Sequence, residues 1–343
     1  MILTDAFLRQ AIACENLGSP FMGQLLRLLA ARWHDGLPLH DKFAAFQGDI
    51  GPAGHSLPLR LAGGLHALVL SHRDDALARS YPPFSTDDET LWSAVEQAMR
   101  THADFLDQWC DSPPQTNEIR RSTVLIAAGH TLAARFGMPL VLSELGASGG
   151  LNLMWDRFAL RIEDQVFGPD YPALTLAPEW EGPLPPATLP EVAARRGVDL
   201  NPLDPRRPAD ALRLLAYLWP DQPERIARTR AAIEVQSARV DRSDAIDWLE
   251  NRLKERHAGR LHLIYHTVAW QYFPPSAQAR GKSLIEQAGA AATDDAPLAW
   301  LAMENDGNDL GAALSLRLWP GNETHNIGRA DFHGRWIRWA GVN

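Results

Sequence analysis

Apolar residues in the N-terminal part of the chain recur at helical spacing. One stripe begins after Ser19-Pro20, an N-cap residue followed by a proline suited to the first helical turn. A second stripe covers residues 91–109 and follows a capping-box pattern at residues 86–89. A further helix is expected from about 117 to 136, ending at a glycine. The pattern therefore predicts an all-helical domain over residues 1–137.

After this point the apolar runs shorten and alternate with helical patterns. Such alternation predicts an α/β domain over residues 138–343 with a mostly parallel sheet. A Trp- and Pro-rich segment at about 155–190 interrupts the pattern and is expected to be an insertion, in the form of a β-hairpin. Because parallel sheets place ligands at the carboxyl ends of their strands, the strand ends are the first place to look for a site. The expected strands are residues 140–144, 261–266, 298–303, 313–319 and 335–340.

Composition narrows the functional classes. The 343 residues include 33 Lys and Arg against 42 Asp and Glu, a net charge of −9, which disfavours nucleic acid as a partner. Cys14 and Cys110 are too few for a disulfide framework or a zinc site, and the twelve histidines show no metal-ligand spacing. Charges break the apolar runs before they reach the length of a membrane span. We therefore expect a cytoplasmic protein that acts on a small molecule, with no metal and no membrane partner.

The segment Glu144-Leu-Gly-Ala-Ser-Gly-Gly-Leu-Asn152 follows the first expected strand and opens a helical pattern. Small residues let the backbone approach a ligand, and the acidic residue can hold an ammonium or a hydroxyl group. A tight turn without a ligand is one alternative. Another is a nucleophile elbow, because Gly146-x-Ser148-x-Gly150 fits the hydrolase pattern. A triad would then need downstream partners, for which Asp306 or Asp309 and His325 or His333 stand in the right order.

Polar groups also follow three later strands. Asp199 is placed to accept hydrogen bonds from ribose hydroxyls, and Asp244, followed by Ala245, to accept one from an adenine amino group. Each has a plain structural alternative, as a turn residue for Asp199 and as a helix cap for Asp244. The segment from His266 to Phe273 places several polar and aromatic groups after a strong strand, where a reaction centre would sit.

This succession resembles the class I S-adenosylmethionine-dependent methyltransferases, with an acidic residue after each of the first three strands and an active-site motif after the fourth. The whole chain also looks like a bacterial family of uncharacterised proteins with a methyltransferase-like Rossmann fold. Its marks here include the Gly146–Asn152 turn, residues 197–202, 219–222, 266–272 and 319–321. The resemblance implies a Rossmann-like, mostly parallel sheet with an N-terminal helical domain. It also implies that S-adenosylmethionine is held by Glu144, Gly146, Ser148, Gly150, Asn152, Asp199, Asp244, Ala245 and His266.

The residues that bind the methyl acceptor are expected in the polar run Gln115-Thr116-Asn117-Glu118, which follows Pro113-Pro114. Four consecutive hydrogen-bonding side chains exceed what a helix cap requires, so this run is expected to face the pocket and the helical domain to act as its lid. Glu118 or His266 would serve as the general base and Tyr272 would orient the acceptor. Gln115, Asn117, Arg121 and Trp270 would bind substrate. Two other functions remain open: a hydrolase that uses Ser148, and a ligand-binding relative without catalysis.

Overall fold

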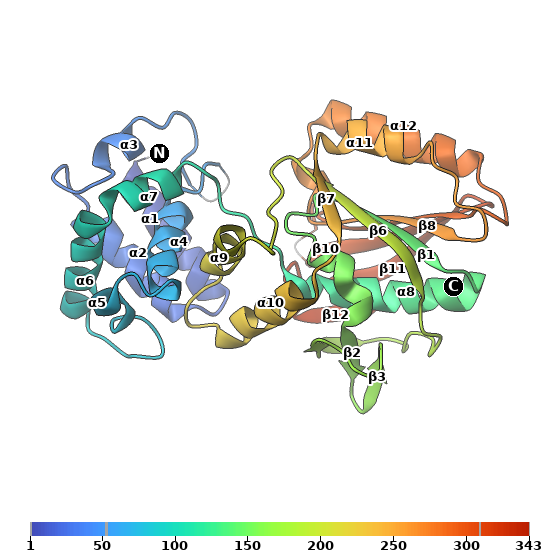
Figure 1. The fold of residues 1–343 in the computed structure, drawn as a ribbon, viewed down its shortest axis with the longest axis horizontal. Helices are drawn as coiled ribbons and strands as arrows, with labels where there is room; N and C mark the ends of the chain where they lie inside the picture. Colours follow the sequence, from blue (N-terminus) through green and yellow to red (C-terminus); the bar gives the residue numbers. More distant parts are fainter. Residues whose placement is uncertain (1, 52–53, 309, 343) are drawn as a thin grey trace. The chain divides into compact units, whose positions relative to one another are not determined.

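The computed structural model describes residues 2–51, 54–308 and 310–342 (Figure 1). The chain divides into two compact units. The helical unit comprises Met1–Thr116 and Arg206–Arg230, and the sheet unit comprises Asn117–Pro205 and Ala231–Asn343. The predicted boundary at 137 therefore lies about one helix too late, and the return of residues 206–230 to the first unit was not foreseen.

Helices make up the regular structure of the described part of the helical unit. Ser19 caps α2 as predicted, since its Oγ accepts a hydrogen bond from the Met22 N–H at 3.3 Å. The cap of α6 is Asp87 rather than Thr86, and its Oδ1 accepts from the Thr90 N–H at 2.8 Å. The expected long stripe breaks at His102 into two helices. The helices are α1 (Leu3–Asn16), α2 (Pro20–Arg32), α3 (His40–Ala44), α4 (Leu57–Leu70), α5 (Asp75–Ala78), α6 (Asp88–Thr101), α7 (Ala103–Cys110), α9 (Pro208–Ala216) and the start of α10 (Pro223–Val235).

The sheet unit is built on a nine-stranded sheet in the order β5-β12-β11-β10-β9-β8-β1-β6-β7. Five neighbouring strands, β7, β6, β1, β8 and β9, pair in parallel. The strands β9, β10, β11 and β12 form an antiparallel meander. The five expected strands are confirmed as β1, β8, β9, β10 and β12. The strands expected before Asp199 and Asp244 are β6 and β7, and β11 was missed. The strands are β1 (Leu140–Leu145), β5 (Glu179–Glu181), β6 (Val192–Asp199), β7 (Arg239–Arg242), β8 (Leu261–Thr267), β9 (Leu298–Glu304), β10 (Ala312–Trp319), β11 (Glu323–Ala330) and β12 (Trp336–Trp339).

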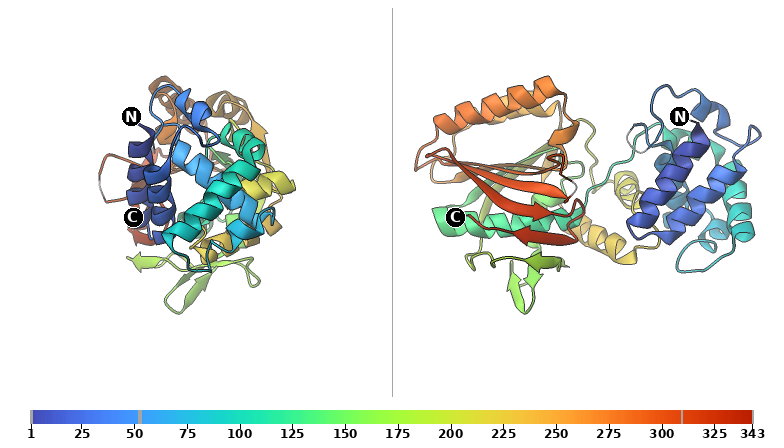
Figure 2. Two further views of the ribbon diagram at one scale, coloured as in Figure 1. Left: turned by 90° about the vertical axis from the view of Figure 1, so that its left-hand side faces the viewer. Right: turned by 180° about the vertical axis from the view of Figure 1, so that it is seen from behind.

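Helices cover both faces of this sheet. The helices α11 (Ala245–Arg252) and α12 (Pro275–Ala290) lie on one face, and α8 (Ser122–Phe136) lies on the other (Figures 1 and 2). Every residue of β1 and β8 is buried between these layers, which explains why apolar residues predominate in both strands. The helix α8 ends at Gly137 with a φ of 61°, the left-handed cap that its sequence predicts.

The expected insertion forms a second, small sheet. The strands β2 (Ala159–Ile162) and β3 (Gln165–Phe167) make an antiparallel hairpin, and β4 (Thr175–Leu176) pairs in parallel with β2. The segment then returns to the main sheet, because β5 pairs with β12 at its edge.

The strand order decides where a ligand can bind. The chain first builds β1, β6 and β7 in one direction across the sheet, then returns to place β8 and β9 on the other side of β1. This reversal between β1 and β8 is a topological switch point, where the loops after the two strands diverge and leave room for a ligand. We call the common end of these five parallel strands the carboxyl edge.

Gly197 on β6 tests how tightly the carboxyl edge is packed. A Cβ atom there would lie 2.6 Å from the Cβ of Ala147 and 2.9 Å from Cδ1 of Leu153. We expect Gly197→Val to lower the free energy of unfolding by about 1–3 kcal/mol, as overpacking does. The exposed Ala194 on the same strand provides the control, and Ala194→Val should stay within about 0.5 kcal/mol. Equal stability of the two variants in urea unfolding would contradict this packing.

Candidate functional site

The Gly-rich turn after β1 is fixed to the end of β6 by its own backbone. The N–H groups of Gly146 and Ala147 both donate to the carbonyl oxygen of Val198 at 3.0 Å, and the Ser148 N–H donates to Oδ2 of Asp199 at 2.9 Å. The turn opens a short 3₁₀ helix, η2 (Asn152–Arg157), rather than an α-helix. These three N–H groups are therefore not the free donors that a helix start would offer to a ligand.

Two glycines of the turn are required by close packing. Gly146 and Gly150 have φ values of 71° and 70°, in the left-handed region that favours glycine. A Cβ on Gly146 would lie 2.5 Å from the Cβ of Ala269, and one on Gly150 would lie 2.7 Å from Cγ2 of Val240. The turn is thus held closely between the segment after β8 and strand β7.

Glu144 is a buried carboxyl group with an unused oxygen. The residue is 2% exposed, and its Oε2 has no hydrogen-bond partner in the described structure. Burial, and then the charge of Asp199, raise the pKa of Glu144 well above its ordinary value, although Arg121 opposes the shift. An unpartnered acceptor in the interior is costly, so it marks Glu144 as a place where a donor from a ligand would be stabilised.

Asp199 ends β6, which pairs with β1, and Asp244 follows β7, which pairs with β6 on the side away from β1. Besides Ser148, the Asp199 carboxylate accepts the N–H of Asn201 through Oδ1 at 2.8 Å. Asp244 caps α11 through Oδ1, which accepts from the N–H groups of Ile246 and Asp247. Asp199 therefore acts as a turn residue and Asp244 as a helix cap, the structural alternatives considered for them. Since a carboxylate can accept about four hydrogen bonds, neither group is saturated by these contacts.

His266, at the end of β8, is held between two neighbouring side chains. The Nε1–H of Trp300 donates to its Nε2 at 2.9 Å, so the ring proton is on Nδ1, which donates to Oε1 of Glu304 at 2.7 Å. Trp270 stacks on the imidazole with ring centroids 4.8 Å apart. Neither nitrogen is available to take a proton from a substrate in this arrangement, so His266 is placed to position other groups rather than to act as the predicted base.

Glu304 is the residue that the sequence prediction missed. Its carboxylate also accepts from the N–H groups of Ala269 and Trp270 at 2.9 and 3.0 Å and thereby fixes the segment after β8. Burial alone would raise the pKa of Glu304, but the hydrogen bonds from His266 and from the backbone bring it below its ordinary value. It could have been predicted as a site residue, because it directly follows the expected strand 298–303.

The polar segment before α8 contacts this edge from within the sheet unit. Oδ1 of Asn117 accepts from the Leu151 N–H at 3.1 Å, and Nδ2 of Asn152 donates to the Glu118 carbonyl oxygen at 3.2 Å. Arg121 reaches the end of β8, where it donates to the Thr267 carbonyl oxygen at 3.0 Å. The segment therefore lies next to the Gly-rich turn, as expected. Asn117, Glu118 and Arg121 belong to the sheet unit, however, and not to the helical unit that was expected to carry them. Gln115 alone belongs to the helical unit.

Glu118 is the buried acid of this segment. It is 3% exposed, and its Oε2 lies 3.5 Å from Nδ1 of His333. Its Oε1 accepts from the Arg120 N–H. The second predicted acceptor-side group, Tyr272, is 74% exposed, and Trp270 packs into the core between the sheet and α12. Glu118 is therefore the buried ionisable group of this segment, whereas Tyr272 lies in solvent.

The hydrolase alternative finds no assembled triad in the described residues. Ser148 has a φ of 52°, yet its Oγ has no hydrogen-bond partner. His325 pairs with Glu323 at 3.0 Å, and Asp306 pairs with Arg329. His333 contacts Glu118 instead of Ser148, and Asp309 lies outside the described residues.

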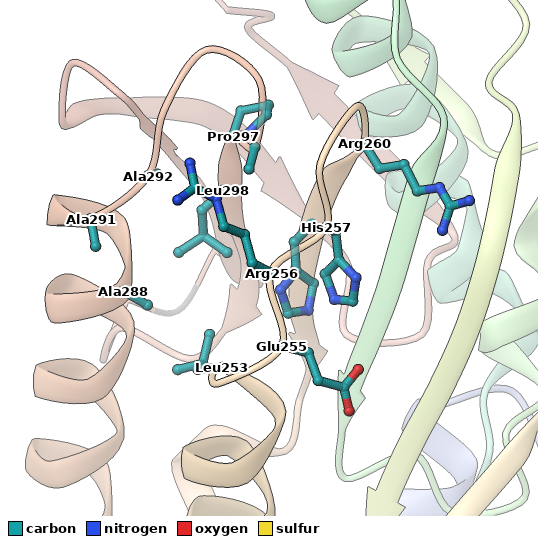
Figure 3. A pocket seen from close by; sticks show the side chains of 12 residues that line it. Leu253, Glu255, Arg256, His257, Arg260, Ala288, Ala291, Ala292, Pro297 and Leu298 are labelled. Atoms are coloured by element: carbon teal, nitrogen blue, oxygen red, sulfur yellow. The ribbon is translucent and has the colours of Figure 1, made fainter.

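A separate pocket lies at the opposite edge of the sheet. It is a cavity of about 220 Å³ between α12 and the segment that precedes β8, near the amino ends of β8 and β9. Figure 3 shows side chains that line it. His257 and His262 line it, and their rings meet edge to face at 4.9 Å. Burial lowers the pKa of His262 to about 3, so this ring is neutral at pH 7. The pocket is remote from the predicted strand-end residues.

Three broader features of the described residues complete this description. They contain no group of three or more His, Cys, Asp or Glu side chains arranged to hold a metal ion. Every helix among them is too short or too polar to cross a membrane. Both cysteines are free and buried.

The raised pKa of Glu144 predicts a pH-dependent stability. Between its ordinary value of 4.5 and its folded value, the folded protein binds more protons than the unfolded chain. The contribution of Glu144 to the free energy of unfolding therefore falls as the pH rises above 4.5, by at most about 1.4 kcal/mol per pH unit. We expect Glu144→Gln to remove this slope and to be more stable than the unchanged protein at pH 7.

Urea unfolding at pH 4, 5.5 and 7 measures this effect. Glu234→Gln, which changes an exposed carboxylate on α10, is the control and should follow the unchanged protein at every pH. A constant difference in stability between the Glu144→Gln variant and the unchanged protein over this range would show that Glu144 does not titrate as described.

Comparison with known proteins gives a family but no activity. No curated protein matches the chain. A family model described as "Uncharacterized protein conserved in bacteria (DUF2332)" matches residues 4–339. The expected membership in an uncharacterised bacterial family is thereby confirmed, while the link to methyltransferases stays a prediction. The chain belongs to this bacterial family, DUF2332.

Proposed function

We propose that the protein is an S-adenosylmethionine-dependent methyltransferase that acts on a small molecule. One observation carries the proposal: Glu144, Asp199 and Asp244 come from β1, β6 and the turn after β7, three neighbours in the sheet. Parallel pairing brings these carboxylates to one edge, beside the Gly-rich turn and the switch point.

The chemistry of the ligand matches this row of acceptors. S-adenosylmethionine carries an ammonium group, a ribose diol and an adenine amino group along its length, and all three are hydrogen-bond donors. The unpartnered Oε2 of Glu144 suits the ammonium, because a buried acceptor gains most from a charged donor. Asp199 would accept from the diol and Asp244 from the adenine amino group. The order β7-β6-β1-β8-β9 of the parallel strands, with its reversal at β1, supports the proposal of a Rossmann-like sheet and the same placement of the ligand.

When bound, the cofactor supplies a methyl group activated on a sulfonium. The chain's own residues then have to hold the acceptor and keep water out. Glu304 fixes the segment after β8 through two backbone N–H groups, and this segment packs against Gly146. Oε2 of Glu118 is the atom assigned to receive the acceptor's proton. His266 contributes by orienting Glu304 and Trp300 rather than by taking the proton.

A ligand-binding protein without catalysis is the second candidate. It is favoured by the two hydrogen bonds that occupy both nitrogens of His266 and by the exposure of Tyr272. Both candidates require the same nucleoside site. They differ in whether bound S-adenosylmethionine is converted to S-adenosylhomocysteine when acceptors are supplied.

Asp244 offers the sharpest test, because its two oxygens do different things. Asparagine is as good a helix cap as aspartate, so Asp244→Asn should leave stability within about 0.5 kcal/mol. Replacing one carboxylate oxygen by an amide nitrogen should nevertheless weaken binding of S-adenosylhomocysteine by roughly tenfold in calorimetry. Asp244→Ala should lose the same affinity and, in addition, about 1 kcal/mol of stability.

The control is Asp247→Asn, three residues further on in the same helix turn, where the carboxylate pairs with Arg280 at the surface. It should bind S-adenosylhomocysteine as the unchanged protein does. If the Asp244→Asn variant also binds with unchanged affinity, Asp244 is a helix cap only. If the unchanged protein binds no S-adenosylhomocysteine at all, the proposed function is wrong.

A further inference from the structure

The helical unit contains a cavity of its own, of about 630 Å³, between α7 and α9. This volume is in the range of sites that hold small metabolites. Its wall combines the segment before α5, the face of α7 that carries Phe105 and Trp109, and the first two turns of α9. The principal lining residues are Arg73, Phe105, Gln108, Trp109, Pro208 and Arg213.

Two arginines in this wall lie over aromatic rings. The guanidinium carbon of Arg213 is 4.2 Å from the ring centroid of Trp109, and that of Arg73 is 4.9 Å from the centroid of Phe105. Stacking fixes the plane of a guanidinium while its N–H edge stays available for hydrogen bonds. Both cations are thereby oriented before any ligand arrives, which lowers the entropic cost of binding one.

Acidic partners do not neutralise these two arginines in the described structure. Arg213 donates only to neutral oxygens, the Tyr217 hydroxyl at 3.4 Å and the Trp109 carbonyl at 3.5 Å. Arg73 makes no ion pair with any described residue. Of the two acids in the wall, Asp111 pairs with Lys42 at 2.6 Å. Asp210 lies in the first turn of α9, where the helix dipole favours a negative charge.

The surroundings of the cavity add further positive potential. Pro208 and Ala209, at the N-terminus of α9, line the wall, and this end of a helix carries a partial positive charge. Behind the wall, the buried guanidinium of Arg60 donates to the carbonyl oxygens of Cys110 and Asp111 at the end of α7 and forms no ion pair with a described carboxylate. The Nε1–H of Trp109 is buried and lacks a hydrogen-bond partner in the described structure.

We propose that this cavity binds a small organic or inorganic oxyanion, a carboxylate or a phosphate, between the N–H edges of Arg73 and Arg213. Planar guanidinium forks match the spacing of two oxygens on one such group. The site is distinct from the carboxyl edge of the sheet, and its test requires no nucleoside. Its success or failure is therefore separate from that of the proposed function.

Calorimetric titration of the full chain with inorganic phosphate, and separately with benzoate, tests the proposal at low ionic strength. We expect saturable binding of at least one probe, and the probe that binds distinguishes a phosphate site from a carboxylate site. Arg73→Ala and Arg213→Ala should each weaken that binding by roughly tenfold or more, the loss typical of a charge-assisted hydrogen bond. Arg213→Lys should bind more weakly than the unchanged protein, because it keeps the charge but loses the fork.

The matched control is Arg100→Ala on α6, which removes an arginine that pairs with Glu96 at the surface. It should bind the probe as the unchanged protein does. Circular dichroism establishes that each variant is folded, and Arg73, which is exposed, provides a variant expected to fold without difficulty. Absence of saturable binding of both probes to the unchanged protein would overturn the proposal. The proposal would also be overturned if the Arg73, Arg213 and Arg100 variants lost the same affinity for the probe, because the loss would then reflect only the change in net charge.

Discussion

The parallel pairing of β1 with a neighbour on each side is the constraint on which the site depends. Strand β1 is buried along its whole length between β6 and β8, so it cannot slip in register without exposing apolar side chains or burying charged ones. The same pairing places Glu144 opposite Gly197 and Tyr265, in the interior. Few hydrogen-bond donors reach a carboxyl group at this position, because the neighbouring strands use their backbone N–H groups in the sheet. The strand register therefore leaves one oxygen of Glu144 without a partner among the described residues.

The expected strands and the edge they share could be predicted because their signals are local. Apolar runs such as 140–144 and 261–266 mark buried parallel strands, and acidic residues directly after them have to meet at one edge. Strand β11 was missed because it carries few apolar residues, with Ile327 and Ala330 as its buried ones. The unit boundary was misplaced because it depends on which surface α8 packs against, and no local pattern in the helix specifies that.

The details of the site required the structure. Glu144, Asp199 and Asp244 were identifiable from their places after strands, and Glu304 could have been found by the same rule. The partners of His266 could not, because Trp300 and Glu304 meet it only through the pairing of β8 with β9. The Gly-rich turn likewise matched a ligand-binding pattern, yet three of its N–H groups donate to β6. A motif indicates where a backbone turns, whereas hydrogen-bond partners depend on strands far away in sequence.

Electrostatics differ between the two units in a way that separates their candidate ligands. The carboxyl edge of the sheet unit gathers carboxylates that accept hydrogen bonds, which suits a ligand rich in donors. The α7–α9 cavity of the helical unit gathers guanidinium groups, which suits an anion. The net charge of −9 does not predict the local charge at either site, because that charge is set by the side chains that the surrounding helices and strands bring together.

Amide hydrogen exchange of the full chain, with and without S-adenosylhomocysteine, tests the central claim most directly. A ligand held along the row of strand ends should slow exchange in the Gly146–Asn152 turn, after Asp199, at the start of α11 and in the segment after β8. Protection in all four segments, which are far apart in sequence, is the result that the account predicts. Unchanged exchange at the carboxyl edge, or protection confined to the pocket at the opposite edge of the sheet, would contradict it.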